Sequence, residues 1–444
     1  MSELRFRRRR RFQLPRNRFL RLIVLPVSGL LICAAIAAGL IYELNRPHNV
    51  SHPDLSFTQP TVSTPTSTTQ TKPTVNNFSW PLYGYTLNRT RDYTAALSSL
   101  RPPFRVAWSH GGNALLEFSP SIYGDYLYYM DDGATVKKVD DRSGRQVWMR
   151  HLGTRSAATP ALDPADNLLF VPLLSLHGNY VGAAGGEFAA LNMSNGRVRW
   201  KLPVAAGSES SPLYHAGVVY FGSQSGTVYA LDARTGRTRW TFSAAGAVKA
   251  GPALWNGMLY FGDYAGKVYC VSATSGKLIW EAGSGSGAFG LGGGTFYATP
   301  AVAYGRVYVG NTNGFVYSFA ARTGQLAWSR GTGAYVYSAP SVADIPGLGP
   351  TVYVGSYSGE FYALNAQSGA IEWTHDDGHS VSGASTIVGN VVYYSDFARQ
   401  STGLNVRTGR VVFSFQDGAY TPVVATPTAI FLNGNYVLYK LVPR

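Results

Sequence analysis

Cysteine is almost missing from this chain of 444 residues, which contains two, Cys33 and Cys270. Cys33 falls in a long apolar run and Cys270 in a predicted strand, so we expect no disulfide between them. No Cys-x-x-Cys-His sequence is present, which excludes the attachment of a c-type haem. Ile32 stands before Cys33, where a lipobox requires a small residue, so a lipid anchor on this cysteine is not expected.

A phosphate-binding loop is also missing, although glycine is abundant. The glycine-rich stretch at residues 283–297 is followed by neither a lysine nor a predicted helix, and a P-loop requires both. This stretch and residues 174–186 interrupt an otherwise regular series of strands. We interpret both as surface loops, and the alternative is that they contact a ligand or a partner.

Acidic residues are scarce at the N-terminus, where residues 1–46 hold ten arginines against two glutamates and account for +8 of the net charge of +14. The 21 uncharged residues 22–42 follow, and at about 1.5 Å per residue they extend about 30 Å, the thickness of a bilayer core. The arginines on one flank predict a cytoplasmic tail (1–21), a transmembrane helix (22–42) and an extracytoplasmic remainder. A cleavable signal peptide is the alternative, but the apolar run is long and its small-x-small site, Ala35–Ala37, lies inside it. We expect no nucleic-acid partner.

Two further segments precede the main domain. Residues 43–77 are rich in Ser, Thr and Pro with almost no charge, which predicts a semi-extended tether without a packed core. Residues 78–103 return to an aromatic composition, and we expect this lead-in segment to pack on the domain that follows.

Residues 104–444 repeat one sequence motif. It consists of a strand, a turn of small residues and glycine, and a short strand that ends in an aromatic residue. The clearest copies are Gly226–Trp240, Gly266–Trp280, Gly314–Trp328 and Gly359–Trp373, and looser copies are Val136–Trp148, Gly186–Trp200 and Leu404–Phe413. The closing aromatics are 40 to 52 residues apart. A period of this length built from strands alone predicts a β-propeller with four-stranded antiparallel blades.

The ring at the end of each repeat is predicted to pack between adjacent blades, because one large flat side chain per blade buries much apolar area. The alternative is a set of stacking platforms for a ligand, but such a site needs a few special rings and not one in every blade. The predicted blade aromatics are Trp108, Trp148, Trp200, Trp240, Trp280, Trp328, Trp373 and Phe413.

The two ends of the repeat region complete each other. Phe104–Trp108 resembles a lone outer strand, whereas Thr428–Leu432 and Tyr436–Leu441 resemble inner strands that no closing strand follows. Joining them gives an eighth blade and removes exposed sheet edges. The predicted fold is therefore an all-β, eight-bladed propeller closed by its N- and C-terminal strands.

The repeat phrase Gly-x-Val-Tyr-Ala-Leu-Asp-Ala-x-Thr-Gly-x-x-x-Trp resembles that of the pyrroloquinoline-quinone (PQQ) propeller superfamily. The superfamily includes quinoprotein alcohol and glucose dehydrogenases and outer-membrane assembly factors of the BamB type, so the resemblance implies a fold and not one function. The alcohol dehydrogenases use a disulfide of adjacent cysteines and a Ca²⁺ held by Glu and Asn beside an Asp base. This chain has no Cys-Cys pair and no long insertions, and a predicted transmembrane helix stands where the BamB type has a lipidated cysteine.

Candidate binding residues lie in the loops just before each Pro-led first strand, which should line the central funnel. These loops present a mixed polar rim without a convincing group of carboxylates, and we expect no metal site and no catalytic residue there. The candidates are Glu117, Arg155, Glu209, Lys249, Tyr297, Tyr337 and His379.

The sequence favours a membrane-anchored, extracytoplasmic propeller that acts as a non-enzymatic binding or scaffold module for envelope proteins or ligands. No cofactor is predicted for this function. The alternative is a small PQQ-dependent dehydrogenase of alcohols or sugars, which would require PQQ and Ca²⁺. Binding of carbohydrate on exposed aromatic rings is a third possibility.

Overall fold

The computed structural model describes residues 30–41, 43, 47–60, 76–96, 98–112, 114–175, 185–284, 293–418, 420 and 423–444. The chain divides into two compact units, one of residues 1–46 with 286–292 and the other of the remainder. In the first unit, residues 30–41 form an exposed helix. No helix within the described residues has both the length and the apolar character needed to cross a membrane.

Parts of several predictions fall outside these residues. The cytoplasmic tail (1–21), residues 22–29 and 42 of the predicted span, and most of the two irregular loops lie there. The membrane anchor and its orientation therefore stay predictions.

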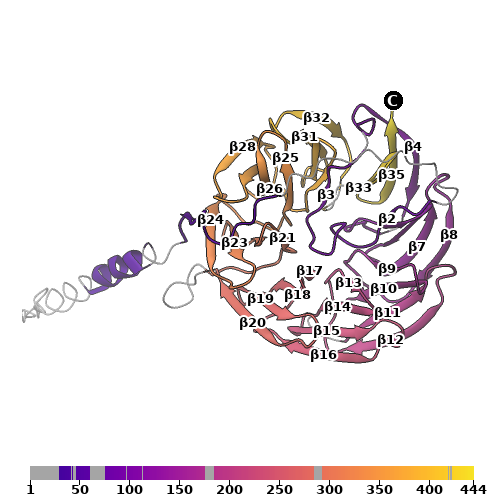
Figure 1. Ribbon diagram of the computed structural model, residues 1–444, viewed down its shortest axis with the longest axis horizontal. Helices are drawn as coiled ribbons and strands as arrows, with labels where there is room; N and C mark the ends of the chain where they lie inside the picture. Colours follow the sequence, from indigo (N-terminus) through magenta and orange to yellow (C-terminus); the bar gives the residue numbers. More distant parts are fainter. Residues whose placement is uncertain are drawn as a thin grey trace, which may run out of the picture. The chain divides into compact units, whose positions relative to one another are not determined.

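The second unit is an eight-bladed β-propeller, as predicted, and Figure 1 shows its eight sheets arranged in a ring. In each blade four antiparallel strands follow one another from the axis outwards. Blades 1 to 4 are β5 (Ser121–Tyr123), β6 (Tyr126–Met130), β7 (Thr135–Asp140), β8 (Gln146–His151); β9 (Ala161–Asp163), β10 (Leu168–Leu173), β11 (Gly186–Asn192), β12 (Val198–Val204); β13 (Leu213–His215), β14 (Val218–Gly222), β15 (Thr227–Asp232), β16 (Thr238–Ser243); and β17 (Ala253–Trp255), β18 (Met258–Gly262), β19 (Lys267–Ser272), β20 (Leu278–Gly283).

Blades 5 to 8 repeat this arrangement. They are β21 (Ala301–Ala303), β22 (Arg306–Gly310), β23 (Phe315–Ala320), β24 (Leu326–Gly331); β25 (Ser341–Ile345), β26 (Gly349–Gly355), β27 (Glu360–Asn365), β28 (Ile371–Asp376); β29 (Thr386–Val388), β30 (Val391–Ser395), β31 (Ser401–Asn405), β32 (Val411–Phe415); and β33 (Val423–Thr426), β34 (Ala429–Asn433), β35 (Val437–Pro443), β4 (Phe104–Gly111).

The eighth blade joins the two ends of the repeat region and confirms the predicted closure. Strand β4 pairs antiparallel with β35, and Trp108 lies opposite Lys440. The Lys440 ammonium also reaches the Asp141 carboxylate of blade 1 at 2.5 Å. The first and last strands of the propeller are therefore held in one sheet, which leaves no unpaired edge at the joint.

The closing tryptophans lie between blades. Each indole N–H donates a hydrogen bond to a backbone carbonyl of the next blade, and the Trp200 bond to Ala233 measures 2.9 Å. The indole also packs on the turn glycine of that blade: a Cβ on Gly236 would come within 2.6 Å of the Trp200 ring. Gly236 has a φ of 73°, so this turn requires glycine both for its backbone conformation and for the ring beside it.

Residues 78–93 cross the centre of the ring, and we call them the axial segment. Strand β2 (Ser79–Trp80) extends blade 1 and β3 (Asp92–Tyr93) extends blade 7. Between them, main-chain carbonyls accept hydrogen bonds from the innermost strands, as Pro81 does from Leu162 and Leu87 from Leu254, both at 2.8 Å. Further bonds of this kind reach blades 5, 6 and 7. One short segment therefore links the inner strands of most blades.

Residues 47–60, which composition places in the predicted tether, pack on blade 5. Strand β1 (Val50–Ser51) pairs with the outer strand β24. Phe57 packs on Tyr304 with ring centroids 5.7 Å apart, and the Arg306 guanidinium lies 5.6 Å from the Phe57 ring. The segment binds because it pairs its backbone with an exposed sheet edge, and composition carries no signal for such pairing.

Candidate functional site

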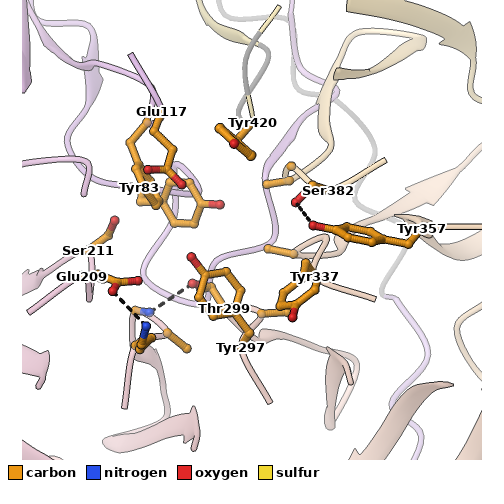
Figure 2. Close-up of a pocket in the computed structure, with 18 residues that line it drawn as sticks. Tyr83, Glu117, Glu209, Ser211, Tyr297, Thr299, Tyr337, Tyr357, Ser382 and Tyr420 are labelled. Carbon is orange, nitrogen blue, oxygen red and sulfur yellow. Dashed lines mark hydrogen bonds and ion pairs between the residues drawn. The ribbon is translucent and has the colours of Figure 1, made fainter. Parts of the chain in front are cut away.

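A cavity of about 180 Å³ opens at the centre of the propeller. Its lining comes from the axial segment and from loops that precede the innermost strands of most blades, so it lies on the propeller axis (Figure 2). We call it the axial cavity. Its lining residues are Tyr83, Glu117, Phe118, Glu209, Ser211, Lys249, Ala250, Gly251, Tyr297, Ala298, Thr299, Tyr337, Ala339, Tyr357, Ser382, Gly383, Ala384 and Tyr420.

A continuous series of six aromatic rings runs from blade 4 to blade 8, and four of them line this cavity. Neighbouring ring centroids in this series are 5.0 to 6.1 Å apart, and Tyr337 and Tyr357 are the closest pair. The Tyr357 hydroxyl bonds Ser382 at 3.2 Å, which fixes one ring at the cavity wall. We call this series the aromatic arc: Tyr264, Tyr297, Tyr337, Tyr357, Phe397 and Tyr420.

The charged groups of the lining come from blades 1, 3 and 4. Glu209 and Lys249 form an ion pair at 3.0 Å, and their side chains are 11% and 19% exposed. Gln224 donates a hydrogen bond to the same carboxylate at 2.7 Å, and the Lys249 ammonium lies 5.0 Å from the Tyr264 ring. The charge of Lys249 is therefore matched by Glu209.

Glu117 is the second carboxylate of the cavity, and it has no hydrogen-bond or ion-pair partner within the described part of the chain. Burial raises its pKa to about 8, and the negative charges of Asp132 and Glu209 add to this rise while Lys249 opposes it. Asp132 behaves similarly, because burial raises its pKa to about 7 although Arg155 opposes the shift. Among the charged residues that the structure describes in the lining there are therefore two carboxyl groups, Glu117 and Glu209, and one ammonium group, Lys249.

Two arginines of the axial segment are fully buried beside the cavity. The Arg89 guanidinium donates to the carbonyls of Tyr83, Pro252 (2.9 Å), Ser211 (3.0 Å) and Pro212 (3.1 Å). Burial, and secondarily the charge of Arg91, lowers the Arg89 pKa to about 9. Arg91 lies 4.6 Å from the ring of Tyr83, and its Nε and Nη2 have no hydrogen-bond partner among the described residues.

A second cavity of about 250 Å³ adjoins the axial cavity and shares Ser382, Gly383 and Tyr420 with it. Asp396 lines the second cavity, and Asp377, His379 and Asp396 place one ligand atom each within 4.8 Å of one another. The His379 Nδ1 is 3.7 Å from an Asp396 oxygen. Burial and the nearby Asp396 carboxyl raise the pKa of Asp377 to about 7. This is a set of groups that could hold a divalent cation.

The structure brings five of the seven sequence candidates together. Glu117, Glu209, Lys249, Tyr297 and Tyr337 all line the axial cavity.

The other two candidates lie elsewhere. Arg155 is exposed in a loop that forms a β-bridge with Ser175. His379 belongs to the carboxylate cluster near the second cavity, and its side chain is 60% exposed.

Sequence reasoning missed Tyr83, Tyr357 and Tyr420. Tyr83 belongs to the axial segment, which is not a repeat, and Tyr420 lies in the incomplete last blade. A signal did exist for Tyr357, because it stands two residues after the glycine that ends the second strand of its blade, as Tyr264 does in blade 4. Both side chains at this repeat position belong to the aromatic arc, and that of Tyr357 lines the axial cavity.

The lining does not fit PQQ with Ca²⁺. PQQ is an anionic cofactor with several carboxylates, and among the described lining residues Lys249 is the single cation, already paired with Glu209. Ca²⁺ requires about six or more oxygen ligands. The Glu209 carboxylate is engaged by Lys249 and Gln224, which leaves Glu117 as the carboxylate without such a partner.

Comparisons with known proteins place the fold. A family model described as outer membrane protein assembly factor BamB matches residues 105–226, 224–344 and 337–441. BamB from Moraxella catarrhalis aligns with a TM-score of 0.60 and 18% identity over 77% of this chain and 100% of that chain. Quinohemoprotein alcohol dehydrogenase from Comamonas testosteroni aligns with a TM-score of 0.65 and 12% identity over 82% of this chain and 80% of that chain. The search of curated proteins gave no match.

Proposed function

The chain belongs to the PQQ-repeat propeller family described by the assembly factor BamB, and we propose that it is a non-enzymatic binding module whose axial cavity holds a ligand. One observation carries the proposal: four rings of the aromatic arc line the same cavity as the Glu209–Lys249 pair and Glu117. Aromatic walls with a few polar groups are typical of binding sites. Because these groups do not fit PQQ and Ca²⁺, a quinoprotein dehydrogenase is disfavoured.

Two measurements on the full-length protein from native membranes test this function. Native mass spectrometry should detect a small bound ligand that is lost in Tyr337→Ala, and retained in a control, Val412→Ala, on an exposed outer strand. With PQQ and Ca²⁺ added, dye-linked oxidation of alcohols and sugars should stay at background. Robust turnover would overturn the non-enzymatic assignment, and the absence of a bound ligand from all three proteins would count against a cavity ligand.

We also propose that residues 22–42 anchor the propeller to the cell membrane on its extracytoplasmic face, where it would meet envelope proteins or ligands. The uncharged run and the arginines on one flank support this topology. Protease added to spheroplasts should remove the propeller and leave the N-terminal tail protected. A propeller that is digested only after the membrane is permeabilised would contradict this orientation.

A further inference from the structure

We propose that the axial cavity binds a small organic cation, an amine or a quaternary ammonium, between the Glu117 carboxylate and the rings of the aromatic arc. This inference rests on the proposed binding function and names the chemical class of the ligand. Two features of the cavity carry it, the balance of its charges and the faces of its rings.

The charges of the lining residues favour a positive ligand beside Glu117, and the buried guanidinium groups of Arg89 and Arg91 lie outside this lining and are bonded to backbone carbonyls. Lys249 is matched by Glu209 at 3.0 Å, so an ionised Glu117 leaves one carboxylate of the lining without a cation. Asp132 and Glu209 face Glu117 from neighbouring loops and both disfavour its ionisation, and Lys249 is the opposing group. A ligand cation placed beside Glu117 supplies the missing counter-charge and stabilises the ionised form.

The rings of the aromatic arc form the second part of the proposed binding site. The π faces of tyrosine attract ammonium groups, and such an attraction strengthens when water is excluded. Figure 2 shows Glu117, Tyr420, Tyr297 and Tyr337 arranged around the same hollow. The buried Arg91 lies over the ring of Tyr83 and would repel a cation there. We therefore place the proposed binding site towards Tyr297 and Tyr420.

Choline and its neutral isostere 3,3-dimethylbutan-1-ol are the probes. They have nearly the same shape, and choline keeps its charge at every pH. Titration of full-length protein in a maltoside detergent, followed through the methyl NMR signals of each probe, gives both affinities. Choline should bind at least about tenfold more tightly than the isostere, as expected for a desolvated cation on aromatic rings beside a carboxylate.

Glu117→Gln should remove this preference, and Glu372→Gln, on the exposed outer strand β28, should leave it unchanged. Raising the pH from about 6.5 to about 9 should tighten choline binding by about tenfold or more, because the competent, ionised form of Glu117 becomes the major one. Asp132 titrates in part of this range, so a flat profile in Glu117→Gln assigns the effect to Glu117.

Equal affinities for the two probes, or a preference for choline that survives in Glu117→Gln, would overturn the cation assignment. If neither probe binds but native mass spectrometry finds a ligand lost in Tyr337→Ala, the cavity binds another class of ligand and the binding function stands. If neither probe binds and no ligand is found, both proposals fail.

Discussion

Replacing Trp108 with alanine tests how the two ends of the chain close the ring. The half-buried indole packs on Phe431, with centroids 5.9 Å apart, and donates a hydrogen bond to Asp141 of blade 1 at 2.7 Å. Removing a fully buried Trp side chain costs about 3–5 kcal/mol. For a half-buried ring that also loses a hydrogen bond, we expect a loss of about 3 kcal/mol.

Trp240→Ala is the matched control, because Trp240 occupies the same position inside the ring. It is also half-buried, it donates to Ala273 at 3.0 Å, and its ring lies against Gly276 as that of Trp108 lies against Gly144. Both variants should melt about 5 °C below the parent in thermal unfolding of the full-length protein. If Trp108→Ala melts like the parent while Trp240→Ala melts lower, β4 does not close the ring.

Gly144→Ala adds a second test at the same joint. A Cβ on Gly144 would lie 2.7 Å from the Trp108 ring, and the φ of 70° strains any residue other than glycine. In the Trp108→Ala background the clash is gone and the backbone strain remains. The double variant should therefore lose less free energy of unfolding than the two single variants lose together. Strictly additive losses would contradict the contact between Gly144 and Trp108.

Three further outcomes follow from buried charge and from the docked segment. Burial raises the pKa of Glu117 from its ordinary value of 4.5 to about 8 in the folded protein. The folded protein therefore loses stability as the pH rises from 4.5 to 8, because Glu117 must ionise in a buried site. In urea titrations at several pH values, Glu117→Gln should reduce this loss by about 1–2 kcal/mol, allowing for partial exposure. Arg89→Met should lower the free energy of unfolding by at least about 2 kcal/mol, because several buried carbonyls lose their donor. Arg91→Met should lower it less, because part of the Arg91 guanidinium has no partner among the described residues. Equal losses on urea unfolding would contradict this reasoning. Phe57→Ala should speed proteolysis within residues 47–60 and leave the propeller resistant, and an unchanged cleavage rate would mean that the ring does not hold the segment.

The propeller and its closure could be predicted because every blade packs on its neighbour through the same kind of contact. Gly236 and Trp200 belong to different repeats, yet they touch, so every repeat keeps both the glycine and the aromatic ring. The half-blades at the two ends were recognisable because each lacked what the other had. The loops before the innermost strands could also be located, since the strands repeat and the cavity is formed where they begin.

The axial segment could not be predicted in this way. It bonds to the blades through main-chain carbonyls, and a main-chain contact places no demand on side-chain identity. Arg89 and Arg91 also contradict the usual preference of arginine for the surface, because backbone carbonyls within the ring satisfy most of the Arg89 donors. Tyr83 reaches the cavity only because this segment crosses the axis.

The same segment connects the fold to the site. Its carbonyls bond to inner strands in blades 2, 4, 5, 6 and 7, and Arg89 bonds to the loop before blade 3, so the position of Tyr83 depends on the spacing of the whole ring. The closing joint fixes that spacing, because an open ring lets blades 1 and 8 separate. A loss of closure should therefore loosen the cavity wall before the blades unfold. For this reason Trp108→Ala, which lies far from the lining, should weaken ligand binding, while Trp240→Ala of equal stability should weaken it less.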